Sequence, residues 1–154
     1  MKKILLFLCL FPFILFSQQT QLPERPSFTA NVLEVDPILD GNVLGDEVWK
    51  NIPSIKKMVQ SKPSFGLPSS EKTEIRVAFT STVMYLGVVC YDSSPNTLVV
   101  SDSRRDASLE DDDSFLFIID TYNDQQNGFL FGTNSSGMEY DAQINNEGVG
   151  NQTN

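Results

Sequence analysis

The sequence predicts an all-β fold, an antiparallel β-sandwich of the jelly-roll or immunoglobulin-like type. Short runs of β-branched and aromatic residues, separated by turn residues, occupy most of the 154-residue chain. Several of these runs alternate apolar and polar residues, which is the period of a strand with one buried face. The sequence has no heptad pattern, long helical pattern or Gly-rich phosphate loop. Many short strands between turns are typical of a sandwich.

The N-terminal residues predict export. Two lysines precede an apolar run over residues 4–16, and the small residue Ser17 follows it. The run is short for a membrane span and is typical of a signal peptide. We therefore expect a signal peptide at residues 1–17, a linker and edge segment at 18–36, and one domain at 37–154. The expected location is the periplasm, the outer membrane or the extracellular space.

The first part of the domain predicts a short helix followed by a strand. Asp46 is a suitable N-cap, and Pro53 would end the helix after about two turns. The only tryptophan, Trp49, lies on this helix among apolar neighbours. We interpret Trp49 as a core anchor rather than an exposed platform for stacking a sugar. A strand is expected at residues 54–62.

Later runs predict two antiparallel hairpins. The expected strands are residues 31–35 at an edge, 73–79, 84–91, 114–120, 128–133 and, with a weaker pattern, 138–144. Residues 84–91 are apolar on both faces, which favours a central position in a sheet. Cys90, within that run, is expected to be a buried small hydrophobic residue.

Composition excludes several classes of function. The chain has a formal net charge of −9 and no histidine. Histidine-dependent triads and histidine-ligated zinc are therefore excluded, and so large an acidic excess argues against nucleic acid as a partner. A glycosidase needs two carboxylates flanking the scissile bond. Because the chain contains 20 acidic residues, the sequence singles out no such pair, and no catalytic residue is predicted.

Three segments together resemble the family 9 carbohydrate-binding-module-like domains at the N-terminus of large secreted or outer-membrane proteins of the Bacteroidota. They read LDGNVLGDEVWKNIP, TEIRVAFTSTVMYLGVVCYD and RRD…DDDSFLFIIDTYND…GFLFGTNSSGMEYD. The resemblance covers roughly residues 38–145. It implies a sandwich that binds polysaccharide or oligosaccharide, as the non-catalytic N-terminal module of a larger exported protein involved in polysaccharide catabolism.

The resemblance also implies that the domain is incomplete at its C-terminus. Strands of the family's sandwich would follow Asn154, and hydrolysis of O-glycosyl compounds or outer-membrane attachment would belong to that later part. The chain departs from the sugar-binding members in one respect. Its single tryptophan matches the family's structural tryptophan, so the stacking tryptophans are missing. The alternative is therefore a structural or interaction β-sandwich of an envelope protein that no longer binds sugar.

Residues near the expected strand ends supply the chemistry of a sugar site. Sugar recognition uses flat apolar faces together with planar polar groups. The candidate ligand-binding residues are Tyr122, Tyr140, Arg105, Asp124, Asn127 and Asn134. Asp92, Asp113 and Asp120 are the candidate metal ligands, because calcium prefers several oxygen ligands and these carboxylates lie at strand ends. Two simpler interpretations remain: the acidic block at 110–113 is a solvated loop, or Arg104 or Arg105 pairs with Asp106 or Asp113 and pins it.

Overall fold

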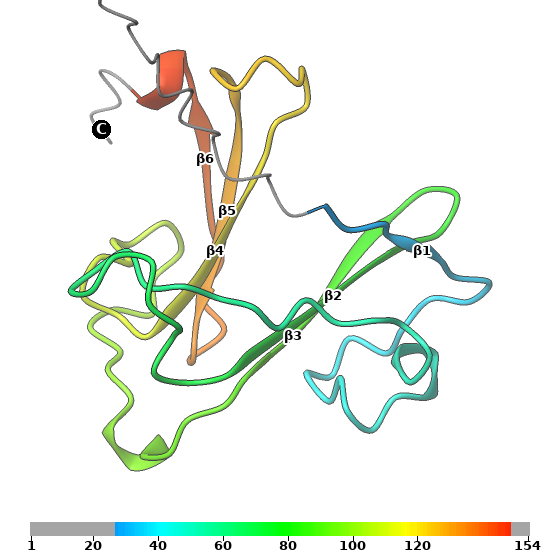
Figure 1. Ribbon diagram of the computed structural model, residues 1–154, viewed down its shortest axis with the longest axis horizontal. Coiled ribbons are helices and arrows are strands. Elements are labelled where there is room, and N and C mark those ends of the chain that lie inside the picture. The colour runs from blue at the N-terminus through cyan, green and yellow to red at the C-terminus, as the bar shows by residue number, and fades with distance from the viewer. Residues whose placement is uncertain (1–26, 149–154) are drawn as a thin grey trace, which may run out of the picture.

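A computed structural model describes residues 27–148 of the chain. The expected signal peptide and most of the expected linker lie outside these residues. The described residues form six strands in two three-stranded sheets and three short 3-10 helices, so the all-β class is confirmed (Figure 1). Among the described residues, no helix is both long enough and apolar enough to cross a membrane.

The first sheet has the order β1–β2–β3. β1 (Asn31–Val32) runs parallel to β2 (Thr73–Phe79), and β2 pairs antiparallel with β3 (Met84–Cys90) over its whole length. The expected hairpin is confirmed. The central position expected for the second strand is wrong, because β2 lies in the middle and β3 is the last strand. Cys90 is exposed for the same reason: it ends an edge strand.

One face of the first sheet carries the apolar core. Asp46 caps the 3-10 helix η1 (Glu47–Trp49), accepting a hydrogen bond from the Val48 amide at 3.3 Å. Trp49 is buried in a cluster with Leu33, Ile52 and Ala78, which confirms it as a core anchor. Gly87 of β3 permits this packing, because a Cβ atom there would lie 3.1 Å from the Trp49 ring.

The strand expected at residues 54–62 is not formed. Only two isolated bridges occur here, between Ile55 and Ile75 of β2 and between Val59 and Pro68. The second bridge belongs to a local loop in which the Gln60 amide donates to the Leu67 carbonyl at 2.8 Å. The segment therefore touches β2 once and then pairs with itself, and the prolines at its turn limit any longer pairing.

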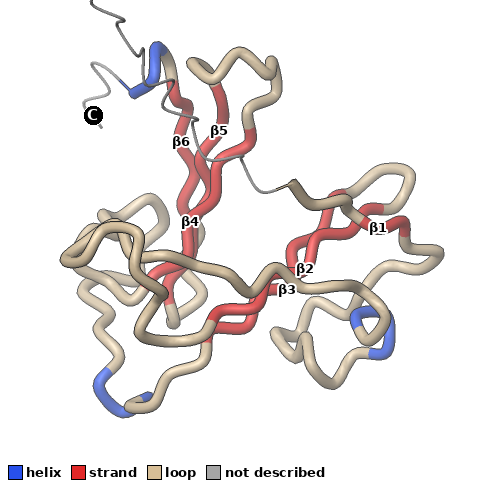
Figure 2. The backbone as a smooth tube through the Cα atoms, viewed as in Figure 1, coloured by secondary structure: helices blue, strands red, loops and turns tan. Residues whose placement is uncertain are grey.

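The second sheet has the order β4–β5–β6, all antiparallel. β4 spans Ser114–Ile119, β5 Gly128–Asn134 and β6 Tyr140–Ile144. These strands are close to the expected ranges, and the last one begins two residues late. In Figure 2 the two sheets stand apart, with the long connecting loops around them. The short helices are η1, η2 (Pro95–Thr97) and η3 (Asn146–Gly148).

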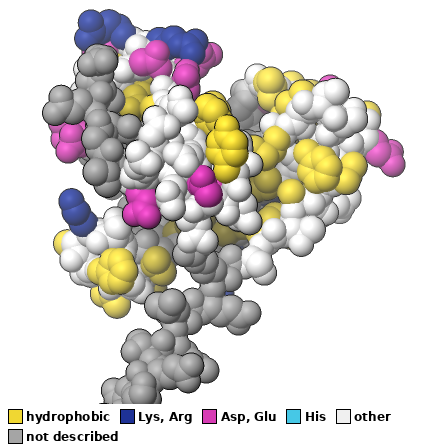
Figure 3. All heavy atoms as spheres, turned by 90° about the horizontal axis from the view of Figure 1, so that it is seen from above, with side chains coloured by type: hydrophobic (Ala, Val, Ile, Leu, Met, Phe, Trp, Pro, Cys, Tyr) yellow, Lys and Arg dark blue, Asp and Glu magenta, His cyan; other side chains and the backbone are white. Residues whose placement is uncertain are grey.

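Both sheets leave apolar side chains partly open to solvent. Met84 on β3 is 46% exposed, and Ile118 on β4 is 61% exposed. Figure 3 shows apolar side chains gathered in separate patches on one face of the molecule. On the other face of the second sheet, which carries Phe117 and Phe131, Phe131 is 36% exposed.

Candidate functional site

A cavity of about 410 Å³ lies against one face of the second sheet. We call it the aromatic groove. Strand register explains which residues line it. Phe117 of β4 lies opposite Phe131 of β5, and Phe131 lies opposite Asp141 of β6. The lining residues are Arg105, Phe115, Phe117, Phe131, Gly132, Thr133, Met138, Glu139, Tyr140 and Asp141.

Aromatic rings form the floor of the groove. The Phe117 and Phe131 rings are stacked, with centroids 5.4 Å apart and planes 27° from parallel. Phe115 extends the row, its ring centroid 6.2 Å from that of Phe117. Alternation along a strand places every second side chain on the same face, so three strand phenylalanines make one continuous apolar surface.

Arg105 forms the polar rim of the groove. Its guanidinium donates to Glu139 Oε2 at 3.0 Å and to Asp141 Oδ1 at 2.7 Å, and it lies 3.4 Å from Asp106 Oδ2. The bond to Asp141, with the negative charges of Asp106, Asp141 and Glu139, raises the pKa of Arg105. Three carboxylates thus surround one cation, and the rim carries a negative excess.

Two hydrogen bonds from main-chain amides hold the turn that presents Arg105. The Asp106 amide donates to the Glu139 carbonyl at 3.0 Å, and the Asp141 amide donates to Asp106 Oδ1 at 3.3 Å. Asp106 adopts a left-handed conformation with φ of 59°, which suits a short polar residue in a turn. The turn is therefore attached to the edge of β6 beside the groove.

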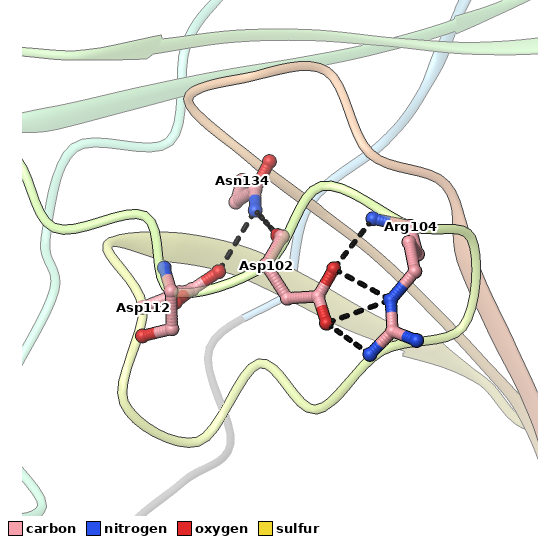
Figure 4. A network of polar contacts seen from close by, with 5 residues as sticks. Asp102, Arg104, Asp112 and Asn134 are labelled. Atoms are coloured by element: carbon pink, nitrogen blue, oxygen red, sulfur yellow. Dashed lines mark hydrogen bonds and ion pairs between the residues drawn. The ribbon is translucent and has the colours of Figure 1, made fainter.

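Asn134, at the end of β5, links the neighbouring loops from below. Its amide nitrogen donates to the Asp102 carbonyl at 3.1 Å and to Asp112 Oδ2 at 2.8 Å (Figure 4). Its oxygen accepts from the Ser136 and Met138 amides. The side chain is buried and uses both ends of its amide, so it joins the β3–β4 connection to the β5–β6 turn.

Arg104 secures the same region from the surface. Its guanidinium donates to both carboxylate oxygens of Asp102, at 2.6 to 3.1 Å, in the geometry that Figure 4 shows. The hydrogen bond from Arg104 lowers the pKa of Asp102 to about 2. The hydrogen bond from Asn134 lowers the pKa of Asp112. The expected pairing of an arginine with Asp106 is confirmed for Arg105, at 3.4 Å, whereas Arg104 pairs with Asp102.

The structure brings two of the predicted ligand-binding residues together. Arg105 and Tyr140 both line the aromatic groove. Asn134 lies near it, but it is buried and engaged in the loop network. The remaining three lie in the β4–β5 loop, at the opposite end of the second sheet (Figure 1).

Carboxylates within the β4–β5 loop accept hydrogen bonds from the amides of the same loop. Tyr122 is 72% exposed and lies outside the groove. Asp124 accepts from the Gln126 and Asn127 amides and from the Asn127 side chain, which lowers its pKa. The polar groups of Asp124 and Asn127 are thus used within the loop.

The structure does not gather the predicted metal ligands. Asp92, Asp113 and Asp120 each accept main-chain N–H groups of nearby loop segments, from Ser94, Val99 and the residues after Asp120. Residues 27–148 contain no group of three or more acidic or cysteine side chains placed to hold a metal ion. Aspartates are common at strand ends because their carboxylates accept main-chain N–H groups in turns. Asp92, Asp113 and Asp120 have this role here.

The sequence interpretation missed the floor of the groove. The sequence places Phe115, Phe117 and Phe131 on expected strands without marking them as a site, and it does not single out Glu139 or Asp141. One signal was present: phenylalanines at alternate positions of two adjacent antiparallel strands fall on one face. Whether that face meets a core or solvent depends on packing that the pattern does not contain.

The pKa values of Glu74, Asp102, Asp112 and Asp124, which lie outside the groove, are all lowered by hydrogen bonds from neighbouring groups. No protein-family model, curated protein or solved structure matches the chain. Functional inference therefore depends on the geometry of the groove.

Proposed function

We propose that this chain is a carbohydrate-binding module and that it binds polysaccharide or oligosaccharide in the aromatic groove. The observation that carries the proposal is the stacked pair Phe117–Phe131 beside the Arg105 guanidinium. Ligand sites commonly combine a mainly apolar lining with a few fixed polar groups. A sugar ring fits that combination, with C–H groups on the aromatic rings and hydroxyls towards Arg105, Glu139 and Asp141.

The proposal extends to the setting of the domain. We place the two sheets in an antiparallel β-sandwich related to the family 9 modules, since each sheet has an apolar face that a sandwich would cover. The basic and apolar N-terminal sequence supports export to the periplasm, outer membrane or extracellular space. In this setting the module holds a polysaccharide substrate while another part of a larger protein performs hydrolysis.

Affinity electrophoresis of the purified chain through gels containing plant or algal polysaccharides tests the proposal. Phe131→Leu keeps an apolar side chain but removes the flat ring, and we expect it to abolish retardation by the polysaccharide that retards the parent. Tyr122→Ala is the matched control at the far end of the sheet, and it should migrate as the parent does. Binding lost in Tyr122→Ala and kept in Phe131→Leu would place the site in the β4–β5 loop instead. Failure of every polysaccharide to retard the parent would oppose sugar binding.

A structural or interaction domain is the second candidate. Its support is that Arg105 is already paired with three carboxylates of its own chain, so the rim needs no ligand to be satisfied. Phe131 is also only 36% exposed. For this candidate, Arg105→Ala lowers the melting temperature and no glycan binds. For the carbohydrate module, Arg105→Lys weakens glycan binding while the melting temperature stays close to that of the parent. The reason is that lysine lacks the planar guanidinium that can contact two hydroxyls.

A further inference from the structure

The negative charge of the chain is concentrated in the half that contains the aromatic groove. Residues 27–90 carry seven acidic and six basic side chains, whereas residues 91–148 carry twelve acidic and two basic ones. Both basic side chains of the second range are already paired, Arg104 with Asp102 and Arg105 with the carboxylates of the groove rim. An anionic ligand of the groove would therefore meet a negative field and find no unpaired cation in residues 91–148.

The rim of the groove has the same imbalance at close range. Arg105 is the only basic side chain of the lining, and it is shared by Asp106, Glu139 and Asp141, so the rim has an excess of two negative charges. Arg105 bonds to Glu139 through Oε2 and to Asp141 through Oδ1. The second oxygens, Glu139 Oε1 and Asp141 Oδ2, accept no hydrogen bond from residues 27–148 and remain available to a donor.

Strand register places one of these carboxylates beside the aromatic floor. Phe117, Phe131 and Asp141 form one row across β4, β5 and β6. Residues directly opposite one another lie on the same face of a sheet, and neighbouring strands are about 4.8 Å apart. A sugar ring stacked on Phe131 therefore has its substituents within reach of the Asp141 carboxylate. An ammonium substituent at this place meets a carboxylate and an aromatic face, and both attract cations.

We propose that the aromatic groove selects glycans of amino sugars with free amino groups, such as glucosamine oligosaccharides, over neutral and acidic glycans. This selectivity rests on the proposed function and refines it, since it concerns the ligand of the same groove. The ammonium group donates to Glu139 and Asp141 beside the Phe131 ring and offsets the negative excess of the rim. A hydroxyl or an N-acetyl group in that place leaves the excess uncompensated. A uronate carboxylate adds a negative charge and competes with the rim for Arg105.

Calorimetric titration with oligosaccharides of equal length tests the ligand class. The probes are tetramers of glucosamine, of N-acetylglucosamine and of galacturonic acid, in a weakly acidic buffer of low salt that keeps the amines protonated. We expect the glucosamine tetramer to bind about tenfold more tightly than the N-acetylated one, because hydrogen bonds between charged groups are the stronger ones. Added salt should narrow this difference, and the galacturonate tetramer should give no binding heat. Glucosamine binding no tighter than that of either other probe would overturn the selectivity.

Two charge-matched variants separate an effect of the rim from the attraction of any cation to an acidic chain. Glu139→Gln/Asp141→Asn removes the two available carboxylates, and Glu34→Gln/Asp111→Asn removes two exposed carboxylates elsewhere with the same change in net charge. The rim variant should weaken glucosamine binding about tenfold while its melting temperature stays close to that of the parent, because exposed ion pairs add little stability. The control variant should bind nearly as the parent does. Equal losses in the two variants would overturn the proposal.

Two further outcomes separate this selectivity from the sugar site itself. If neutral polysaccharide binds in a way that Phe131→Leu abolishes but the glucosamine tetramer does not bind, the selectivity is wrong and the sugar site stands. If the glucosamine tetramer binds Phe131→Leu as it binds the parent, the groove is not the site and both proposals fail. A tetralysine peptide that binds as tightly as the glucosamine tetramer would show a general cation site and would also overturn the selectivity.

Discussion

The two sheets are stabilised by different means. The first sheet packs one face against buried apolar side chains around Trp49, and its Gly87 makes room for the ring. The second sheet has apolar residues on both faces but few that are buried. Its loops are joined instead by the Asn134 network and by the ion pairs of Arg104 and Arg105.

This difference separates a sheet held by apolar burial from one held by polar loop contacts. Apolar burial supplies most of the favourable free energy of folding, whereas exposed ion pairs supply little. The first sheet therefore serves as the stable part of the described chain. The second sheet keeps its phenylalanines partly exposed, and its polar loops hold that aromatic surface in place. Exposed rings and fixed rim groups are the features on which the proposed sugar site depends.

Replacing Trp49 should have the largest effect. Trp49→Ala removes the centre of the buried cluster, and large-to-small core changes of this kind cost about 3–5 kcal/mol. Urea unfolding followed by circular dichroism at the strand band measures the loss. Phe65→Ala removes another aromatic ring that is 89% exposed, and it should leave the midpoint nearly unchanged. Equal losses in the two variants would show that the cluster is not the main anchor of the fold.

The contrast between the sheets also explains what the sequence could predict. Alternation and turn chemistry are local signals, and they gave the β2–β3 hairpin and the strands of the second sheet nearly to the residue. The position of β3 at an edge depends on which segment pairs with β2. That neighbour proved to be the short strand β1, from more than 40 residues earlier. The predicted burial of Cys90 is wrong for the same reason, because the burial of a strand residue depends on which segments pack beside that strand.

Replacing Asn134 should have a smaller effect, confined to the second sheet. Asn134→Ala leaves the Met138 amide and the Asp102 carbonyl without their partner, and an unsatisfied buried polar group costs about 1–3 kcal/mol. Hydrogen exchange should become faster in β4–β6 before it changes in β2 and β3. Ser135→Ala, at the exposed neighbouring position, is the control. Uniformly faster exchange in both sheets would mean that the two regions unfold as one unit.

The candidate site was only partly readable from the sequence. Arg105 and Tyr140 were chosen for their side-chain chemistry, and the fold places both at the groove. Tyr122, Asp124 and Asn127 had equally suitable chemistry but lie at the other end of the sheet. Side-chain chemistry alone does not tell which loops lie at the same end of the sheet. That information comes from register, where Phe117 opposite Phe131 defines the floor.

Lowering the pH should change the stability of the two regions by different amounts, and this is the smallest effect that we predict. Glu74 in the first sheet is held by Lys72 at 2.6 Å and Arg76 at 2.9 Å, and the bond from Lys72, followed by that from Arg76, lowers its pKa to about 2 from an ordinary 4.5. The bond from Arg104 lowers the pKa of Asp102, in the loop before β4, to about 2 from 3.8. A carboxyl group with a lowered pKa in the folded state contributes stability above its unfolded pKa, and this stability is lost as pH falls towards the folded pKa.

Melting temperatures of the parent, Glu74→Gln and Asp102→Asn should therefore differ by constant amounts above about pH 5 and converge between about pH 4.5 and pH 2. The convergence should be larger for Glu74→Gln, because its side chain is 6% exposed against 28% for Asp102 and water screens the Asp102 pair more. Melting curves that stay parallel from pH 7 to pH 2 would show that neither pair stabilises the folded state.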